Sequence, residues 1–284
     1  DDSACSNAVV VSKPAAEIIG KPGYPVRKQE EMPAIHLTEP KFGVHVFDFG
    51  QNMVGVVRIK IHGHQFGDEV VIRYAEMLQA NGMIYTENLR GAKCTDTVYC
   101  NDYGEIVFEP KFTFHGFQFV ELTGLRRKPD LSDVTGIVLH TEIPATGLFE
   151  CSEPLIKQLQ HNIVWGQKGN FFETPTDCPQ RDERLGWTGD AQIFIGTAAF
   201  NRDVASFFEK YCEDMEDAQF SDGRIPHVAP NPFRDEKGNS GKGGGQAAWA
   251  DAVVICPWVT YLCYGDVRIL ERRYESMKKF VDWR

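Results

Sequence analysis

The hydrophobic pattern of this chain changes its period near Pro144, and no other feature constrains the fold as strongly. Before Pro144, segments such as residues 56–61 and 69–74 alternate apolar and polar residues, which is typical of half-buried strands. After it, apolar residues such as Leu155 and Leu159 recur at helical spacing. The pattern therefore predicts an antiparallel β-sandwich followed by a helical region.

The predicted strands are short and are separated by turn signals such as Asn81-Gly82. They cover residues 44–49, 54–62, 69–76, 97–100, 117–123 and 134–140. The first predicted helix has Ser152 as its cap and places Leu155, Leu159 and Ile163 on one face. Further helices are predicted over residues 190–200, 202–218, 246–264 and 267–283. The last one meets no stop signal, so we expect the chain to be part of a larger helical domain.

The charge balance narrows the classes of partner. The chain has 30 Lys and Arg residues against 40 Asp and Glu residues, which gives a net charge of −10. This balance argues against nucleic acid or an anionic membrane as the main partner, because both are bound by a positive face. No apolar run reaches the ~18–20 residues of a membrane span. The charge balance is compatible with a neutral ligand and with self-association of the chain.

The cysteines give no sign of a metal centre. None of the eight forms a C-x-x-C pair or stands near a histidine at zinc spacing, so no metal or other cofactor is expected. A Cys94–Cys100 disulfide stays open if the protein is exported. The sequence starts at Asp1 without a leader, so the compartment is open between the cytoplasm and the periplasm or exterior of a bacterium.

Residues 174–190 form the densest charged stretch outside the predicted helices, and two prolines and two glycines exclude a continuous helix there. The stretch combines four carboxylates, two guanidiniums and an indole, from Asp177, Asp182, Glu183, Asp190, Arg181, Arg184 and Trp187. Such a set can bind several hydroxyls, stack on a sugar face and hold a carboxyl whose pKa is raised by like-charged neighbours. Composition alone also fits a salt-bridged surface loop.

Residues 177–191 read Asp-Cys-Pro-Gln-Arg-Asp-Glu-Arg-Leu-Gly-Trp-Thr-Gly-Asp-Ala, which closely resembles the signature loop of bacterial α-L-rhamnosidases. The resemblance continues through residues 47–55, 73–77, 112–120 and 248–252, and covers the chain from about residue 40 to its end. It implies a β-sandwich at residues 41–146 and the first, truncated part of an (α/α)6 catalytic barrel at residues 147–284. Residues 1–40 are then a linker, or the end of a preceding domain, with at most one strand.

The resemblance also implies an activity and a site. The activity is the inverting hydrolysis of terminal α-L-rhamnosyl residues in rhamnose-containing glycosides or polysaccharides. Glu183 matches the general acid, and nearby carboxylates are expected to keep it protonated. Substrate contacts are implied for Asp177, Arg181, Trp187 and Asp190, and for Trp249 and Asp251 in the Trp-Ala-Asp match.

Other interpretations stay open for some of these residues. Trp249 and Asp251 could instead pack at a helix start, and Asp182 could pair with Arg184. His227 lies in the long Pro-rich connection over residues 220–245. It could line a sugar cleft or lie on the surface, and the sequence does not distinguish the two.

The general base has no match in this chain. An inverting glycosidase needs a second carboxylate ~6.5–9.5 Å from the acid, and the family places it later in the barrel. We therefore expect an incomplete, inactive part of an α-L-rhamnosidase that lacks the base. Two alternatives stay open: a related barrel glycosidase acting on another terminal sugar, and a non-catalytic carbohydrate-binding module.

Overall fold

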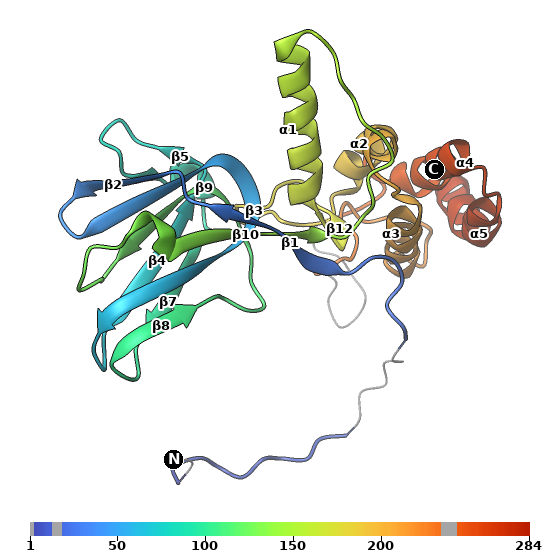
Figure 1. Ribbon diagram of the computed structural model, residues 1–284. Coiled ribbons are helices and arrows are strands. Elements are labelled where there is room, and N and C mark those ends of the chain that lie inside the picture. The colour runs from blue at the N-terminus through green and yellow to red at the C-terminus, as the bar shows by residue number, and fades with distance from the viewer. Residues whose placement is uncertain (1–2, 13–18, 234–242) are drawn as a thin grey trace.

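The computed structural model describes residues 3–12, 19–233 and 243–284. A strand-rich part lies on one side and a helical part on the other, and helix α1 (Pro154–Asn170) stands between them (Figure 1). The predicted order of an antiparallel strand-rich part followed by helices is thereby confirmed.

The strand-rich part is one antiparallel sheet in the order β1-β10-β3-β9-β4-β7, with β2 and β8 also paired to β3. Its strands are β1 (Val26–Pro33), β2 (His36–Lys41), β3 (Val44–His64), β4 (Glu69–Ala75), β7 (Thr95–Tyr99), β8 (Gly104–Phe108), β9 (His115–Thr123) and β10 (Val134–Thr141). β3 changes partners along its length, from β2 and β9 to β10 and β8. This change allows strands on both sides of β3 to share one core, which includes Phe47, Ile59, Tyr74 and Phe117.

Three strand predictions were wrong. β1 and most of β2 lie within the stretch expected to be a linker; most of their residues are exposed, so the apolar alternation was too weak to predict them. The two strands expected at residues 44–49 and 54–62 are the single strand β3, whose register shifts between Asp48 and Met53 instead of turning. β8 was not predicted, because only alternate residues of it are even half-buried.

The remaining short elements connect the sheet and the helices. They are β5 (Met77–Leu78), β6 (Ile84–Tyr85), β11 (Phe171–Phe172) and β12 (Thr174–Pro175), and the 3₁₀ turns η1 (Glu87–Leu89) and η2 (Leu131–Asp133). Cys94 and Cys100 are both buried and both free, so the disulfide left open for them is absent.

After α1 the helices are α2 (Thr188–Asn201), α3 (Ala205–Asp217), α4 (Ala252–Tyr264) and α5 (Arg268–Trp283). α2 packs on α4, α3 packs on α4 and α5, and α4 packs on α5. Their shared core contains Ile195, Phe208, Tyr211 and Cys256. The part of the 220–245 connection that covers residues 234–242 lies outside the described residues.

The helix starts differ from the prediction. α1 is capped by Glu153, whose Oε1 accepts a hydrogen bond from the Leu155 backbone N–H at 3.2 Å, and not by Ser152. A carboxylate at this position suits the helix dipole. α4 begins at Ala252, after a turned segment, and not at Gln246.

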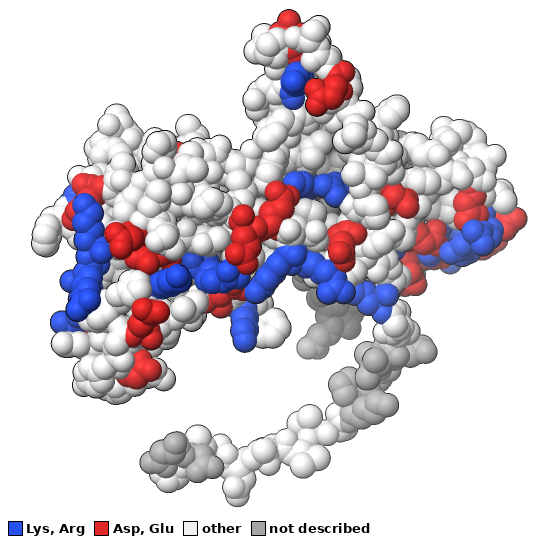
Figure 2. All heavy atoms as spheres, in the orientation of Figure 1, with Lys and Arg blue, Asp and Glu red and all other residues white. Residues whose placement is uncertain are grey.

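Several apolar side chains on the helices face solvent. Leu155 and Leu159 of α1 are 79% and 57% exposed, so the face predicted to pack is unburied near the helix start. Ile193 and Phe200 of α2 are 81% and 85% exposed. In Figure 2 the region around α2 and α4 carries few charged side chains, whereas charges gather along the lower edge of the same face. Within the described residues, no helix is both long and apolar enough to cross a bilayer.

Candidate active site at the junction of sandwich and helices

The charged stretch predicted to carry the chemistry lies where the helical part meets the sandwich. We call residues 177–187 the acid loop. A small hairpin of β11 and β12 precedes it, and Phe171 of β11 stacks on Phe207 of α3 with ring centroids 4.4 Å apart, which fixes the start of the loop. The loop then packs on the sandwich at Gly116, where an added Cβ would come within 2.9 Å of Gln180 Cβ. Glycine at this position therefore permits the close approach of the two parts.

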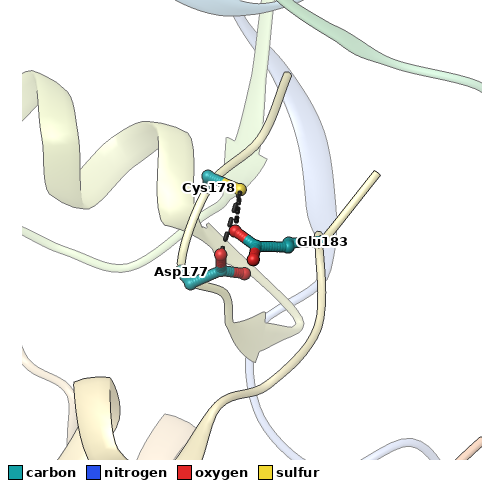
Figure 3. Close-up of side chains that lie close together, drawn as sticks. All are labelled: Asp177, Cys178 and Glu183. Carbon is teal, nitrogen blue, oxygen red and sulfur yellow. Dashed lines mark hydrogen bonds between the residues drawn. The ribbon is translucent and has the colours of Figure 1, made fainter. Parts of the chain in front are cut away.

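Asp177, Cys178 and Glu183 bring their side chains together at the centre of the acid loop (Figure 3). The Cys178 thiol donates to Asp177 Oδ2 at 3.0 Å and lies 3.8 Å from Glu183 Oε2. The contacting atoms of the three residues lie within 4.8 Å of one another, so the carboxyl groups of Asp177 and Glu183 are close enough to influence each other's ionisation. The loop thus holds a carboxyl pair with a buried thiol beside it.

The two carboxyls of this pair have opposite pKa perturbations. Burial raises the pKa of Asp177, and the nearby Glu183 carboxyl raises it further. The Asp177 carboxyl lowers the pKa of Glu183, and the guanidiniums of Arg90 and Arg181 also favour its charged form. Asp177 Oδ1 is buried and has no hydrogen-bond partner among the described residues. The expectation that neighbouring carboxylates keep Glu183 itself protonated is therefore wrong for this structure.

Two arginines hold Glu183. Arg181 Nη2 lies 2.7 Å from Glu183 Oε2, and Arg181 Nε donates to Cys178 Sγ at 3.3 Å. Arg90 comes from the sandwich; its Nη2 lies 3.1 Å from Glu183 Oε1 and its Nε 2.9 Å from Asp182 Oδ1. Arg90 is thus the partner of Asp182, and the pairing with Arg184 left open from the sequence is not formed.

A cavity of about 540 Å³ lies beside the acid loop, between α1, α2 and the segment before α4. Its walls are mainly apolar, with a few polar groups from the helices and the loop. They include Ile163, Phe171, Ile193, Phe194, Trp249, Asn170, Thr176, Asp177 and Asp190. Of the residues predicted for the site, Asp177, Asp190 and Trp249 therefore share one cavity.

The other predicted residues do not line this cavity. Glu183 and Arg181 lie behind Asp177 in the paired cluster. Trp187 precedes α2, and its indole Nε1 is buried without a partner among the described residues. Asp251 Oδ2 accepts a hydrogen bond from the Ala248 N–H at 2.8 Å, which explains Asp251 as a turn-forming residue before α4. Substrate contacts of these residues stay predictions.

His227 lies close to the cavity. Its ring centroid is 6.2 Å from that of Trp249, and its carbonyl accepts the Thr188 N–H at 2.9 Å. It therefore helps to hold the start of α2 and is not a plain surface residue.

Asp177, Cys178 and Glu183 are also the one group in the described part of the chain whose ligand atoms, all within 4.8 Å of one another, could hold a metal ion. However, Arg181 already donates to both Cys178 Sγ and Glu183 Oε2, so an ion would have to displace a guanidinium. The cluster is better suited to holding a proton.

Sequence reasoning missed two members of the cluster. Cys178 lies within the quoted motif, but no role was predicted for it. Arg90 carried no signal, because it is 92 positions away from Asp182 and lies in the other part of the molecule.

Comparison with known proteins adds evidence that is independent of this geometry. Residues 38–140 match the bacterial alpha-L-rhamnosidase concanavalin-like domain, and residues 144–284 match the bacterial alpha-L-rhamnosidase 6 hairpin glycosidase domain. The chain is 49% identical over 265 residues to an alpha-L-rhamnosidase of Streptomyces avermitilis, which covers 93% of this chain and 25% of that protein. It is 45% identical over 238 residues to one from Formosa agariphila, with 83% and 25% covered. The chain thus spans about a quarter of the length of these curated relatives.

Solved structures agree with this result. The crystal structure of the Streptomyces avermitilis alpha-L-rhamnosidase complexed with L-rhamnose matches with a TM-score of 0.86 at 47% identity, over 92% of this chain and 25% of that chain. The alpha-L-rhamnosidase from Dictyoglumus thermophilum matches with a TM-score of 0.91 at 38% identity, over 100% of this chain and 31% of that chain. Two adjoining family domains and these relatives together show that the chain belongs to the bacterial α-L-rhamnosidase family.

Proposed function

We propose that this chain is the acid-bearing part of an α-L-rhamnosidase that hydrolyses terminal non-reducing α-L-rhamnosyl residues with inversion. The observation that carries the proposal is the carboxyl pair of Asp177 and Glu183, of which Asp177 lines a partly open cavity. A cavity of about 540 Å³ is within the range of small-molecule sites, and its apolar walls with few polar groups are typical of them.

The cavity suits one 6-deoxy sugar. Rhamnose carries hydroxyl groups and an apolar C6 methyl group, so its site needs both carboxylates and apolar contacts. Asp177 and Asp190 offer oxygen acceptors for hydroxyls, while Phe194 and Trp249 offer aromatic surface. Asp190, in the first turn of α2, is exposed and therefore accessible to a ligand.

In the proposed reaction, Glu183 protonates the departing glycosidic oxygen. The proton is stored by the pair rather than by Glu183 alone, because two close carboxyls titrate as a unit. Burial favours the proton on Asp177, and the proximity of the two carboxyls allows Glu183 to regain it. A base, which we place outside this chain, activates the water that attacks from the opposite face.

The direct test is hydrolysis of p-nitrophenyl α-L-rhamnoside by the full-length protein, followed by NMR of the first sugar formed. Inversion gives β-L-rhamnose first, with the α anomer appearing only by mutarotation. An α anomer at the start would contradict inversion. Turnover of a different terminal aryl glycoside instead would assign another sugar.

The 284-residue chain tested alone should release no nitrophenol, since the proposed base is missing from it. Its exposed apolar helix faces should also make it self-associate in sedimentation measurements. Turnover by a monomer of this chain at the rate of the full-length protein would refute our placement of the base.

A further inference from the structure

Three side chains join the acid loop to the sandwich, two from the sandwich and one from the loop. Cys94 Sγ donates to the Gln180 carbonyl at 2.8 Å, and Arg184 Nη1 of the loop donates to the Phe114 carbonyl at 3.0 Å. Cys94 therefore holds the loop backbone, and Arg184 binds the backbone of the sandwich. The third side chain, Arg90, differs because it contacts the side chains of the loop, including the carboxyl proposed to be the acid.

The backbone around Arg90 is built to hold its side chain in place. Arg90 follows the 3₁₀ turn η1, and its N–H donates to the Glu87 carbonyl at 3.3 Å. Its φ of +54° is a value that residues with a side chain seldom adopt. Leu89, next to it, is 1% exposed and belongs to the sandwich core. The backbone that carries the Arg90 side chain is therefore anchored to the sandwich core.

The guanidinium of Arg90 binds both acidic residues at once. Its Nε lies 2.9 Å from Asp182 Oδ1 and its Nη2 lies 3.1 Å from Glu183 Oε1. Arg181 contacts the other oxygen of the same carboxyl, Oε2, at 2.7 Å. With one guanidinium on each oxygen, the orientation of the Glu183 carboxyl is fixed.

We infer that Arg90 is a positioning residue of the active site, by which the sandwich orients the carboxyl group of the acid Glu183. Asp182 acts as the second anchor of the Arg90 guanidinium. This inference rests on the proposed function, because it needs Glu183 to be the acid.

The inference predicts the sign of a pH effect. The charged or titratable groups next to Glu183 are Asp177, Cys178 and Arg181 from the acid loop and Arg90 from the sandwich. Arg90 and Arg181 both stabilise the ionised pair. Removing Arg90 leaves the pair one cation short, so the proton of the pair is retained to higher pH. The high-pH limb of kcat/KM, which reports loss of the acid's proton in the free enzyme, should then move upward.

The experiment compares variants of the full-length protein on two rhamnosides, one with an activated nitrophenol and one with a poor alcohol leaving group. Arg90→Gln and Arg90→Ala remove the charge, and Arg90→Lys keeps it. Arg126→Ala is the matched control, because Arg126 is 48% exposed against 46% for Arg90 and likewise pairs with a carboxylate, Asp68, but far in sequence from the acid loop. Asp182→Asn removes the second anchor but leaves the guanidinium on Glu183.

We expect Arg90→Gln to lower kcat on the poor leaving group by about tenfold, a part of the ~10²–10⁴-fold that a general acid contributes, with little change in KM. Its high-pH limb should move up, and Arg90→Lys should restore it. Asp182→Asn should not move the limb upward, and Arg126→Ala should match the wild type. If Arg90→Ala does not fold, the Gln and Lys variants carry the comparison.

Three outcomes overturn the inference. The first is an Arg90→Gln variant that behaves like Arg126→Ala. The second is an effect on KM or stability with an unmoved limb, which indicates a merely structural ion pair. The third is an equal upward shift in Asp182→Asn. A wild-type protein without rhamnosidase activity would instead overturn the proposed function, and this inference with it.

Discussion

The sandwich and the helical part differ in how completely they bury their apolar residues. In the sandwich, strands on both sides of β3 share one core, and Phe47, Tyr74 and Phe117 are each 0% exposed. In the helical part, α2 buries Ile195 but leaves Ile193 and Phe200 in solvent. The core of the sandwich is therefore closed around these rings, although Phe42 and Phe112 in its loops are exposed, while α2 presents an apolar face that more chain could cover. Relatives about four times as long have such chain available.

The acid loop lies where these two parts meet, and the difference between them explains its construction. The sandwich holds the proposed acid through Arg90, while residues of α1 and α2 form much of the cavity wall. A site needs a rigid support for its reacting groups, and here the sandwich supplies it.

The largest difference between the two parts is expected in the unfolding free energy of two phenylalanine variants of the 284-residue chain. Phe117→Ala removes a fully buried ring from the sandwich core and should cost about 3–5 kcal/mol of unfolding free energy. Phe200→Ala removes a ring that is 85% exposed, and should change the same quantity by less than about 0.5 kcal/mol. Urea unfolding followed by circular dichroism measures both.

Equal losses of unfolding free energy in the two phenylalanine variants would contradict the difference in burial between the sandwich and the helices. In the full-length protein, Phe200→Ala should become costly if further chain covers α2. An effect that stays near zero there would show that this face is solvent-exposed in the complete protein as well.

A smaller effect sharpens the assignment of the cavity. Asp190 lines it, whereas Asp251 is bound to the Ala248 N–H. Asp190→Asn in the full-length protein should weaken inhibition by rhamnose by ~1–3 kcal/mol, the cost of leaving a sugar hydroxyl without its acceptor. Asp251→Asn should leave the inhibition constant nearly unchanged. Titration calorimetry with rhamnose distinguishes the two, and a loss confined to Asp251→Asn would move the sugar site away from the cavity.

The smallest effects concern pH, and they have opposite signs in the two parts. In the sandwich, the guanidinium of Arg126 and the Gln65 backbone N–H lower the pKa of Asp68 to about 2. Because this folded-state pKa is below the unfolded one, the stabilisation is present above the unfolded pKa and is lost as the pH falls through about 2. Arg126→Ala should therefore lower stability at neutral pH, and the difference from wild type should vanish near pH 2.

In the helical part, burial raises the pKa of Asp214, although Lys210 lies 2.5 Å away. Its neutral form is favoured by folding, so this contribution is present below the unfolded pKa and is lost as the pH rises through the folded pKa. Asp214→Asn should accordingly gain stability relative to the wild type between acidic and neutral pH. A parallel pH dependence of the two proteins would exclude burial as the dominant influence on Asp214.

Periodicity predicted the class of fold well, because interior strands and long helices repeat apolar residues strongly. It failed where burial is one-sided or absent. β1 and β8 were not predicted, since their side chains are mostly exposed and only their backbone pairing makes them strands. The break expected at Gly50 was wrong because pairing with β9 on both sides of it carries the strand through.

The site was predictable only as far as it is local in sequence. The motif placed Asp177 and Glu183 together, and the structure brings their carboxyl groups within 4.8 Å of each other. The motif could not indicate which of the two holds the proton, because burial and the arginines decide this in three dimensions. Nor could it reveal Arg90, whose contact with Glu183 depends on how the sandwich packs against the acid loop.

The most direct test of the account is the dependence of Glu183→Gln on the leaving group, measured as kcat in the full-length protein. As a control we choose Glu142→Gln, an exposed carboxylate paired with Arg27. Loss of the acid should lower kcat by ~10²–10⁴-fold on rhamnosides with poor leaving groups and far less on an activated aryl rhamnoside, which departs without protonation. The control should match the wild type on both substrates. An equal loss on both substrates in Glu183→Gln would contradict the role of Glu183 as the general acid.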